Sequence, residues 1–259
     1  MFDQGKGTPL VVIPGVQGRW EWMRPALRAL ARRCRTISYS LCGDFGSGVR
    51  FDSTLGFDAF VRQVDDVLAQ VGERRVALCG VSYGGIIAAR YAAANPDRVA
   101  ALVLVSAPGP DWQPNALQGR YVARPWQSLP MFCVTALDRL GAEVYEALPN
   151  WPARARFACR YLAGVVAAPM IPALMARRVR LHQETDFRCD CERISAPTLV
   201  ITGEPRLDRV VPVESTRQYV RLIRGARYEL MDRTGHLGLI TQPERFAGIV
   251  SGFIHASHS

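Results

Sequence analysis

Val76-Ala77-Leu78-Cys79-Gly80-Val81-Ser82-Tyr83-Gly84-Gly85 is the stretch of sequence that decides the fold. Its first four residues form a short apolar run, which predicts a buried strand, and the alanine-rich residues 85–94 predict a helix that ends before Pro96. The Gly-x-Ser-x-Gly pattern therefore lies on a tight strand-to-helix turn, where glycine removes Cβ atoms that would clash. Such a turn lifts a serine hydroxyl clear of the sheet, which predicts Ser82 as a nucleophile. The alternative is a plain glycine-rich turn that cradles a phosphate, but the sequence lacks the lysine of a Walker loop.

Strands and helices alternate on both sides of this turn. Short apolar runs predict further strands, and apolar residues at three- and four-residue spacing predict amphipathic helices. The expected strands are 10–13, 35–40, 75–79, 100–106, 197–202 and 227–231, and the expected helices are 20–33, 57–71 and 243–255. This alternation predicts the α/β class, with a mostly parallel, doubly wound sheet covered by helices on both faces.

The alternation is interrupted between the strands at 100–106 and 197–202. Residues 107–193 are rich in aromatic side chains and proline and lack an obvious β pattern. We therefore expect a core domain made of residues 1–106 and 194–259, with a mainly helical insertion over residues 107–193. Residues 162–176 of the insertion are apolar except for two prolines. They are interpreted as a helix pair packed within the insertion, or alternatively as a pocket wall, an interface or a membrane-contacting patch.

Composition excludes several classes of function. The net charge is +9, but the arginines are scattered in pairs without a long basic run, so no nucleic-acid partner is expected. The sequence has seven cysteines without the spacing of a disulfide scaffold, no apolar leader and no run of 18 apolar residues. We therefore expect a cytoplasmic protein without stable membrane insertion. Cys189-Asp190-Cys191 has no histidine near it beyond His182, so no metal site is expected.

A serine nucleophile needs a base, and the chain offers four histidines. His255 and His258 belong to the terminal tail, and His182 belongs to the insertion. His236 follows the last expected strand and comes after the serine in the chain, with acidic residues between them. Because a loop after that strand can bring its side chain over Ser82, the sequence predicts His236 as the base.

The segment Gly80–Gly85 resembles the nucleophile elbow of the α/β-hydrolase superfamily, in its serine-nucleophile, lid-containing and esterase-like branch. Four further segments resemble the family in the same order along residues 10–106 and 194–255. They are the oxyanion loop (14–18), the strand before the acid (196–204), the acid loop (208–212) and the histidine loop with the last helix (234–237 and 242–246).

The resemblance implies Asp208 as the third catalytic residue, the carboxylate that orients the histidine. The spacing departs from the usual Gly-x-x-Asp of the family, because Asp208 lies five positions after Gly203. Glu204, which is nearer the strand, and Asp111, which follows the strand at 100–106, remain alternatives.

The resemblance also implies an oxyanion hole made by the backbone N–H groups of Val16 and Tyr83. The family often has His-Gly where this chain has Pro14-Gly15, which alters how the loop is held without removing the backbone donor. Side chains near this loop and in the insertion are expected to bind substrate, and the insertion is expected to act as a lid. These substrate-binding candidates are Gln17, Trp20, Trp112 and Trp126, and Arg19 is either a contact for an acidic substrate or solvated.

The activity expected from this resemblance is serine hydrolysis of a carboxylic ester through an acyl-enzyme, without a cofactor. The substrate is expected to be a small acyl compound, largely apolar because of the aromatic insertion. The alternatives are carbon–carbon bond or thioester hydrolysis, acyl transfer, cofactor-free perhydrolysis and a non-enzymatic ligand-binding role. The sequence does not indicate an oligomeric state.

Overall fold

The computed structural model describes residues 1–257. Through this part of the chain runs one sheet of seven strands in the order β1-β3-β2-β4-β5-β6-β7. The strands are β1 (Phe2–Gln4), β2 (Pro9–Ile13), β3 (Arg35–Ser38), β4 (Val76–Val81), β5 (Val99–Val105), β6 (Thr198–Thr202) and β7 (Arg227–Leu230). Only β1 pairs antiparallel, with β3, and every other pairing is parallel. The predicted mostly parallel α/β sheet is confirmed.

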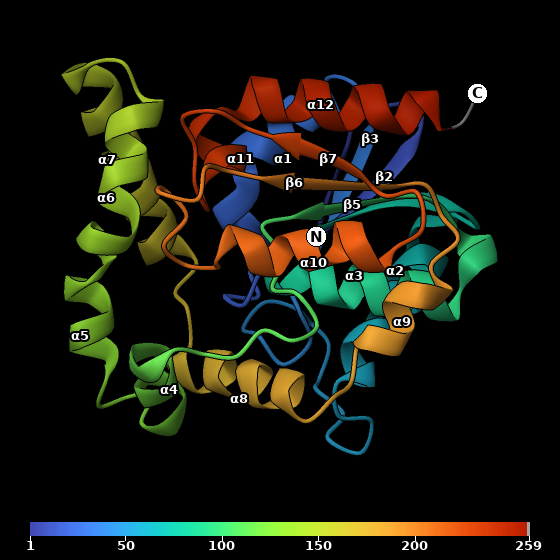
Figure 1. The fold of residues 1–259 in the computed structure, drawn as a ribbon, viewed down its shortest axis with the longest axis horizontal. Coiled ribbons are helices and arrows are strands. Elements are labelled where there is room, and N and C mark those ends of the chain that lie inside the picture. The colour runs from blue at the N-terminus through green and yellow to red at the C-terminus, as the bar shows by residue number, and fades with distance from the viewer. Residues whose placement is uncertain (258–259) are drawn as a thin grey trace.

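Helices cover both faces of the sheet (Figure 1). One face carries α1 (Arg24–Ala31), α11 (Gly238–Thr241) and α12 (Pro243–Ala256), and the other carries α2 (Asp58–Val71), α3 (Tyr83–Ala94) and α10 (Val213–Leu222). Every residue of β4 and β5 is buried, because helices pack on both sides of the central strands. This explains why these strands are continuous apolar runs rather than alternating ones.

The sequence prediction missed β1, α10 and α11, and it misjudged one helix. The edge strand β1 is only three residues long, α11 is only four residues long, and most residues of α10 are polar. The helix expected over 20–33 begins as a 3₁₀ turn, η1 (Trp20–Met23), and α1 follows it directly. A second 3₁₀ turn, η2 (Pro96–Arg98), follows α3.

The insertion between β5 and β6 is helical. It contains α4 (Ala116–Ala123), α5 (Leu129–Val134), α6 (Ala136–Ala147), α7 (Trp151–Ala167), α8 (Pro172–Gln183) and α9 (Arg188–Arg193). The side chains of Asn115 and Asn150 cap α4 and α7 by accepting backbone N–H groups. In Figure 1, α5, α6 and α7 stand as a column beside the sheet, and α4 and α8 lie at the bottom of the view, below α3 and α10.

The apolar run 162–176 is divided between the end of α7 and the start of α8. Leu162 and Val166 on α7 are 63% and 82% exposed, so this half of the run is not packed within the insertion. Among residues 1–257, no single helix is long and apolar enough to cross a bilayer, although α7 and α8 together pass on length and composition with an 89° bend between them.

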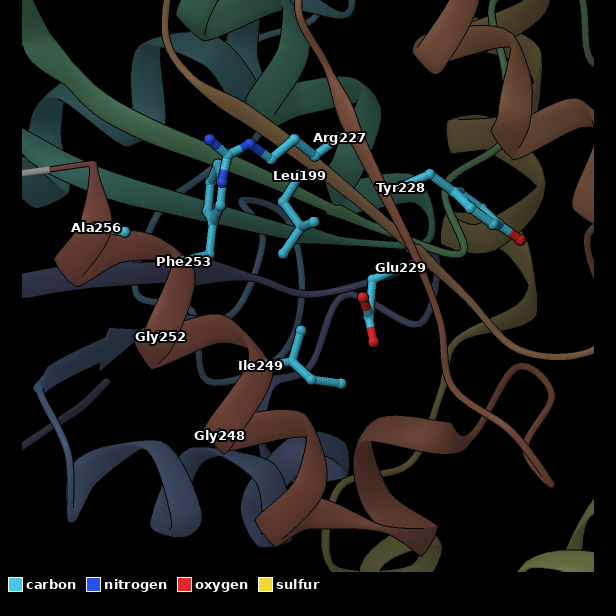
Figure 2. A pocket seen from close by; sticks show the side chains of 9 residues that line it. All are labelled: Leu199, Arg227, Tyr228, Glu229, Gly248, Ile249, Gly252, Phe253 and Ala256. Carbon is cyan, nitrogen blue, oxygen red and sulfur yellow. The ribbon is translucent and has the colours of Figure 1, made fainter.

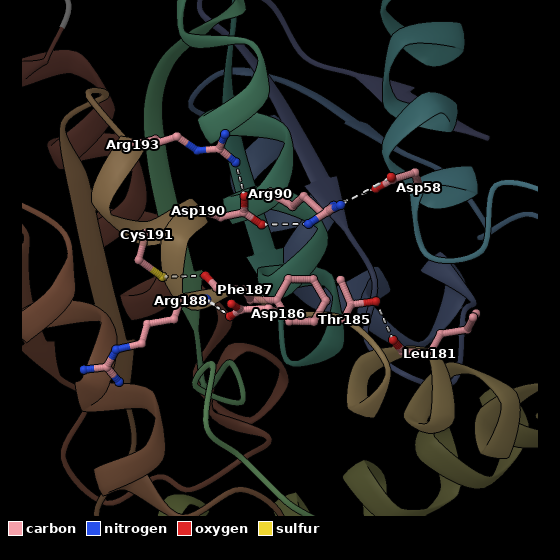
Figure 3. Close-up of polar contacts among 10 residues, drawn as sticks. All are labelled: Asp58, Arg90, Leu181, Thr185, Asp186, Phe187, Arg188, Asp190, Cys191 and Arg193. Atoms are coloured by element: carbon pink, nitrogen blue, oxygen red, sulfur yellow. Dashed lines mark hydrogen bonds and ion pairs between the residues drawn. The ribbon is translucent and has the colours of Figure 1, made fainter.

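The end of the insertion is tied to the core through α9. Arg90 of α3 donates to Asp190 of α9 at 3.0 Å and to Asp58 of α2 at 2.6 Å, and Arg193 pairs with the same Asp190 (Figure 3). Asp190 is buried, and two guanidinium groups satisfy its carboxylate. Buried carboxylates need such partners to offset the loss of hydration. This network fixes the returning chain against the helix that follows the Gly-x-Ser-x-Gly turn.

Candidate active site

Ser82 lies at the carboxyl end of β4, in the middle of the sheet, where α3 begins. Its backbone has φ 52° and ψ −123°, a conformation that a residue with a side chain rarely adopts. Hydrogen bonds from Ser82 N–H to the Val105 carbonyl and from Gly85 N–H to the Ser82 carbonyl, both 2.8 Å, hold the turn. Strain of this kind persists only where its surroundings enforce it, and it is typical of functional positions.

The glycines around Ser82 are required by close backbone approach. A Cβ at Gly80 would lie 2.4 Å from the Gly84 carbonyl oxygen, and one at Gly84 would lie 2.3 Å from the Ile13 carbonyl oxygen. Neither backbone atom can move without breaking the sheet or the helix. The turn predicted from the sequence is therefore formed, and its glycines have the steric role expected of them.

His236 and Asp208 face each other after the two strands beyond β5. Asp208 follows β6 and His236 follows β7, and the imidazole Nδ1 lies 3.2 Å from Asp208 Oδ2. The other carboxylate oxygen of Asp208 accepts the N–H groups of Val210 and Val211 at 3.1 and 3.0 Å, which fixes the carboxylate. Because β4, β6 and β7 run parallel, Ser82, Asp208 and His236 all belong to loops at the carboxyl ends of the strands.

The environment of His236 makes it a stronger base than a free histidine. Burial by itself lowers the pKa of the imidazole, but the charge and hydrogen bond of Asp208 outweigh it and hold the pKa above its ordinary value. An orienting carboxylate of this kind both fixes the tautomer and stabilises the imidazolium that forms when the base accepts a proton.

The alternative acids have other partners. Glu204 accepts the N–H of Arg233 at 2.6 Å and pairs with Arg206, so it supports the turn that leads to His236. Asp111 pairs with Arg188. Of these carboxylates, the structure brings Asp208 to the imidazole.

Two glycines allow the acid and histidine loops to meet. A Cβ at Gly203 would lie 2.4 Å from the Thr234 carbonyl oxygen, and one at Gly235 would lie 2.4 Å from the Leu207 carbonyl oxygen. The N–H of Glu204 donates to the Thr234 carbonyl at 2.8 Å across the same contact. Only the absence of both side chains lets the loops pack at this distance.

The loop after β2 lies directly beside Ser82. A Cβ at Gly15 would lie 3.3 Å from the Cβ of Ser82, so the backbone of residues 15 and 16 borders the serine. Tyr83 is the first residue of α3, and its N–H has no acceptor within the helix. The two backbone donors expected from the sequence thus belong to segments that flank Ser82.

A buried arginine of the insertion holds this loop. Arg178 of α8 donates through Nη1 to the Val16 carbonyl at 2.8 Å, and its Nη2 forms an ion pair with Asp44. Both charged side chains are almost fully buried, and burial raises the pKa of the Asp44 carboxyl even with Arg178 against it. The arginine therefore joins α8 to the loop beside the nucleophile.

A model of the alpha/beta hydrolase family matches residues 10–249, nearly the whole chain. The chain belongs to this family. The 2-hydroxy-6-oxo-2,4-heptadienoate hydrolase of Pseudomonas putida is 28% identical to this α/β hydrolase, over 99% of the chain and 92% of the relative. The pimeloyl-acyl-carrier-protein methyl ester esterase of Nitrosomonas europaea is 26% identical, over 93% of the chain and 94% of the relative.

Solved structures agree on the fold of this α/β hydrolase. The enol-lactonase from Burkholderia xenovorans superposes with a TM-score of 0.79 at 19% identity, covering 98% of this chain and 95% of that one. An esterase from Thermogutta terrifontis gives the same TM-score at 22% identity, covering 100% of this chain and 93% of that one. The family and fold expected from the Gly80–Gly85 turn are confirmed.

The side chains expected to bind substrate are dispersed in this α/β hydrolase. Gln17 is half-buried, and its side-chain oxygen lies 3.0 Å from where a Cβ at Gly15 would be, so it borders the loop beside Ser82. Trp112 packs edge-on against His182, with ring centroids 5.5 Å apart. Trp20 packs against Phe2, and Trp126 is 61% exposed. The placement of these last two tryptophans does not favour substrate contact.

Arg19 is neither solvated nor free to bind an acidic substrate. It is buried, and it donates to Glu21 and to the Phe45 carbonyl, both at 2.6 Å. The ion pair with Glu21 neutralises its charge within the protein, so the sequence-level alternatives for this residue were both wrong.

A hollow of about 400 Å³ lies between α12 and the edge strand β7, away from Ser82 (Figure 2). Apolar side chains such as Leu199, Ile249 and Phe253 line it together with Arg227 and Glu229. Because it lacks a nucleophile and a histidine, it does not compete with Ser82 as the reactive site. Among residues 1–257, no group of three metal-ligating side chains is placed to hold an ion.

One buried residue near the site escaped sequence reasoning. Glu143 of α6 is 0% exposed, and its Oε2 accepts the N–H of Leu237, the residue after His236, at 2.8 Å. A lone glutamate on a half-polar helix looks solvated in a sequence, and only the tertiary contact reveals otherwise.

Asp208 and Glu204 give a matched pair of substitutions for this site. We expect Asp208→Asn to lower kcat by about 10³–10⁴-fold, because the amide cannot fix the tautomer and stabilise the imidazolium. Glu204→Gln should stay within about threefold of the parent, because its amide oxygen still accepts the Arg233 N–H. Steady-state hydrolysis of a p-nitrophenyl ester measures both variants. Equal losses in the two would contradict the assignment of Asp208.

Proposed function

We propose that this α/β hydrolase cleaves carboxylic esters through an acyl-enzyme formed on Ser82. The observation that carries the proposal is that the strained Ser82 and the hydrogen-bonded His236–Asp208 pair all follow the carboxyl ends of parallel strands. Serine on such a turn, with a base oriented by a carboxylate, is the arrangement that acyl transfer requires.

The reaction follows from the roles of these groups. His236 accepts the hydroxyl proton of Ser82 as its Oγ bonds to the carbonyl carbon, and the N–H groups of Val16 and Tyr83 stabilise the oxyanion. The carbon–oxygen bond of the ester then breaks, and the departing alcohol takes the proton from His236. A water molecule, deprotonated by His236, attacks the acyl carbon, and the proton returns to Ser82 as the acid leaves. No cofactor enters these steps.

A second candidate is hydrolysis of a carbon–carbon bond at the same site. It is favoured by the relatives, because 2-hydroxy-6-oxo-2,4-heptadienoate hydrolase and 2-hydroxymuconate semialdehyde hydrolase each match 97% or more of the chain at 28% identity. Esterase and lactonase relatives match at 26% and 24% identity. These identities are too close together to separate the two reactions. Fold and family do not determine which bond is cleaved, and the residues of the pocket do.

The substrate is proposed to be a small acyl compound with a largely apolar body. The insertion over residues 107–193 is proposed to act as a cap domain above the site, because α6 and α8 each contact a loop that carries a proposed catalytic group. Its aromatic side chains favour an apolar acyl or alcohol group.

A substrate panel tests the proposal. We expect turnover of p-nitrophenyl esters with short and medium acyl chains at a higher kcat/KM than turnover of a 2-hydroxy-6-oxo-dienoate, which reports carbon–carbon cleavage. An enol-lactone in the panel separates cyclic from open-chain esters. Cleavage of the dienoate without measurable ester turnover would replace the first candidate by the second.

A further inference from the structure

The inference concerns Glu143, which no step of the proposed reaction uses. It is the one buried residue of α6, a helix that lies wholly within the described part of the chain. Helices normally bury apolar side chains, and a carboxylate is among the costliest groups to bury. A helix that buries only a glutamate indicates that this carboxylate has a role beyond packing.

The contacts of Glu143 are with the histidine loop. Its Oε2 accepts the Leu237 N–H at 2.8 Å, so the peptide that follows His236 is held from the insertion. Its Oε1 is buried without a hydrogen-bond partner in the described residues. One oxygen therefore fixes the loop, and the other is buried in the same contact without a hydrogen bond of its own.

We propose that Glu143 is a positioning residue that holds the loop of His236 from the insertion and, when ionised, keeps the His236 imidazole basic. The proposal rests on the proposed function of His236 as the base. It extends that function by giving the insertion a part in preparing the base, separate from covering the substrate.

The charges around Glu143 determine the sign of its effect. Asp208 and His236 face it from the core, and Tyr161 faces it from α7, with Arg139 of α6 acting on the same tyrosine. Burial raises the pKa of Tyr161 to about 12, so that phenol is neutral near pH 7. The ionised Glu143 and Asp208 both favour the protonated imidazole, which raises the pKa of His236.

Glu143 itself titrates near neutrality. Burial raises the pKa of its carboxyl to about 7, although the N–H groups of Leu237 and Gly235 and the charge of His236 act in the opposite direction. Lowering the pH through this value neutralises Glu143 and weakens its support of the imidazolium. Activity depends on neutral His236. The fall in kcat/KM at acid pH is therefore expected to reflect protonation of both His236 and Glu143.

Glu143→Gln tests the charge with little change of shape. The amide oxygen still accepts the Leu237 N–H, but the negative charge is gone, so the pKa of His236 should fall. The weaker base should lower kcat by up to about tenfold at neutral pH, with KM within about twofold. The acid limb of the kcat/KM profile should move to lower pH with the pKa of His236.

The control is Glu146→Gln on the same helix. Glu146 is more exposed and pairs with Arg206, so its variant removes a charge without touching the histidine loop, and the His236 pKa should not change. Glu143→Leu removes the acceptor as well, and its kcat should fall below that of Glu143→Gln.

The decisive measurement is the pKa of His236 by NMR titration of the imidazole, with the signal assigned by its loss in His236→Gln. A lower pKa in Glu143→Gln than in the parent supports the proposal, and an unchanged pKa overturns it. The NMR titration needs no substrate. Failure of Ser82 to react with a fluorophosphonate would instead count against the proposed function, so the two failures are distinguishable.

Discussion

Replacing Ser82 with alanine is expected to abolish turnover and covalent labelling while the protein stays folded. The hydroxyl oxygen is the only heavy atom that the substitution removes, and the turn that holds it is fixed by backbone contacts of Gly80 and Gly84. Loss of a serine nucleophile typically lowers kcat by about 10⁶-fold, and the residual rate reflects the oxyanion hole and substrate binding alone. Hydrolysis of a p-nitrophenyl ester and labelling with a fluorophosphonate measure the two effects.

Ser106 provides a matched control for this experiment. It is also a buried serine with a positive φ, 43°, and it directly follows the neighbouring strand β5. Ser106→Ala should keep both labelling and turnover within a few-fold of the parent. Labelling that persists in Ser82→Ala, with circular dichroism unchanged from the parent, would show that another residue is the nucleophile.

Replacing Arg178 with leucine is expected to have the largest effect on stability. It leaves Asp44 buried without its partner, which typically costs about 3–5 kcal/mol of the free energy of unfolding. At roughly 2–4 °C per kcal/mol for a chain of this size, Tm should fall by about 6–20 °C. It also removes the donor from the Val16 carbonyl, so kcat should fall in the protein that remains folded.

The neighbouring Arg177 is the control for Arg178. It is half-buried and lies over the Phe51 ring at 4.0 Å, so Arg177→Leu removes a charge from the same turn of α8 without unpairing Asp44. Denaturant unfolding of Arg178→Leu, Asp44→Leu and the double variant gives the coupling energy between the two charges, and Arg177→Leu is measured beside them. Removing both charges should recover part of the stability. Equal losses in Arg177→Leu and Arg178→Leu would contradict a specific ion pair.

The fold could be predicted from the sequence wherever local pattern decides structure. The Gly80–Gly85 turn is specified by its own glycines and by the apolar strand before it, so residues close in sequence carried the prediction. The short strand β1 was missed because three residues, two of them polar, form a strand only by pairing with β3. Such pairing is a tertiary contact that no local pattern contains.

The candidate site divides in the same way. Ser82 and His236 follow from the order of motifs. The resemblance implied Asp208 but left Glu204 open, and the contact at His236 Nδ1 favours Asp208. Glu143 and Arg178 carry no motif, and only their burial against distant loops distinguishes them from solvated charges. The role of Arg19 was misjudged for the same reason, because its partner Glu21 is visible in the sequence but its burial is not.

Two buried charges of the insertion, Glu143 and Arg178, limit how new specificities can arise in this protein. Glu143 contacts the histidine loop and Arg178 contacts the loop beside Ser82, so the segment proposed to cover the site also holds these two loops. A cap exchanged as a block with that of a relative would bring new pocket walls but would leave Asp44 and the Leu237 N–H unpaired. Transplants should succeed only when a glutamate and an arginine return to these two positions, whereas substitutions at exposed residues such as Leu162 and Val166 remain unconstrained by them.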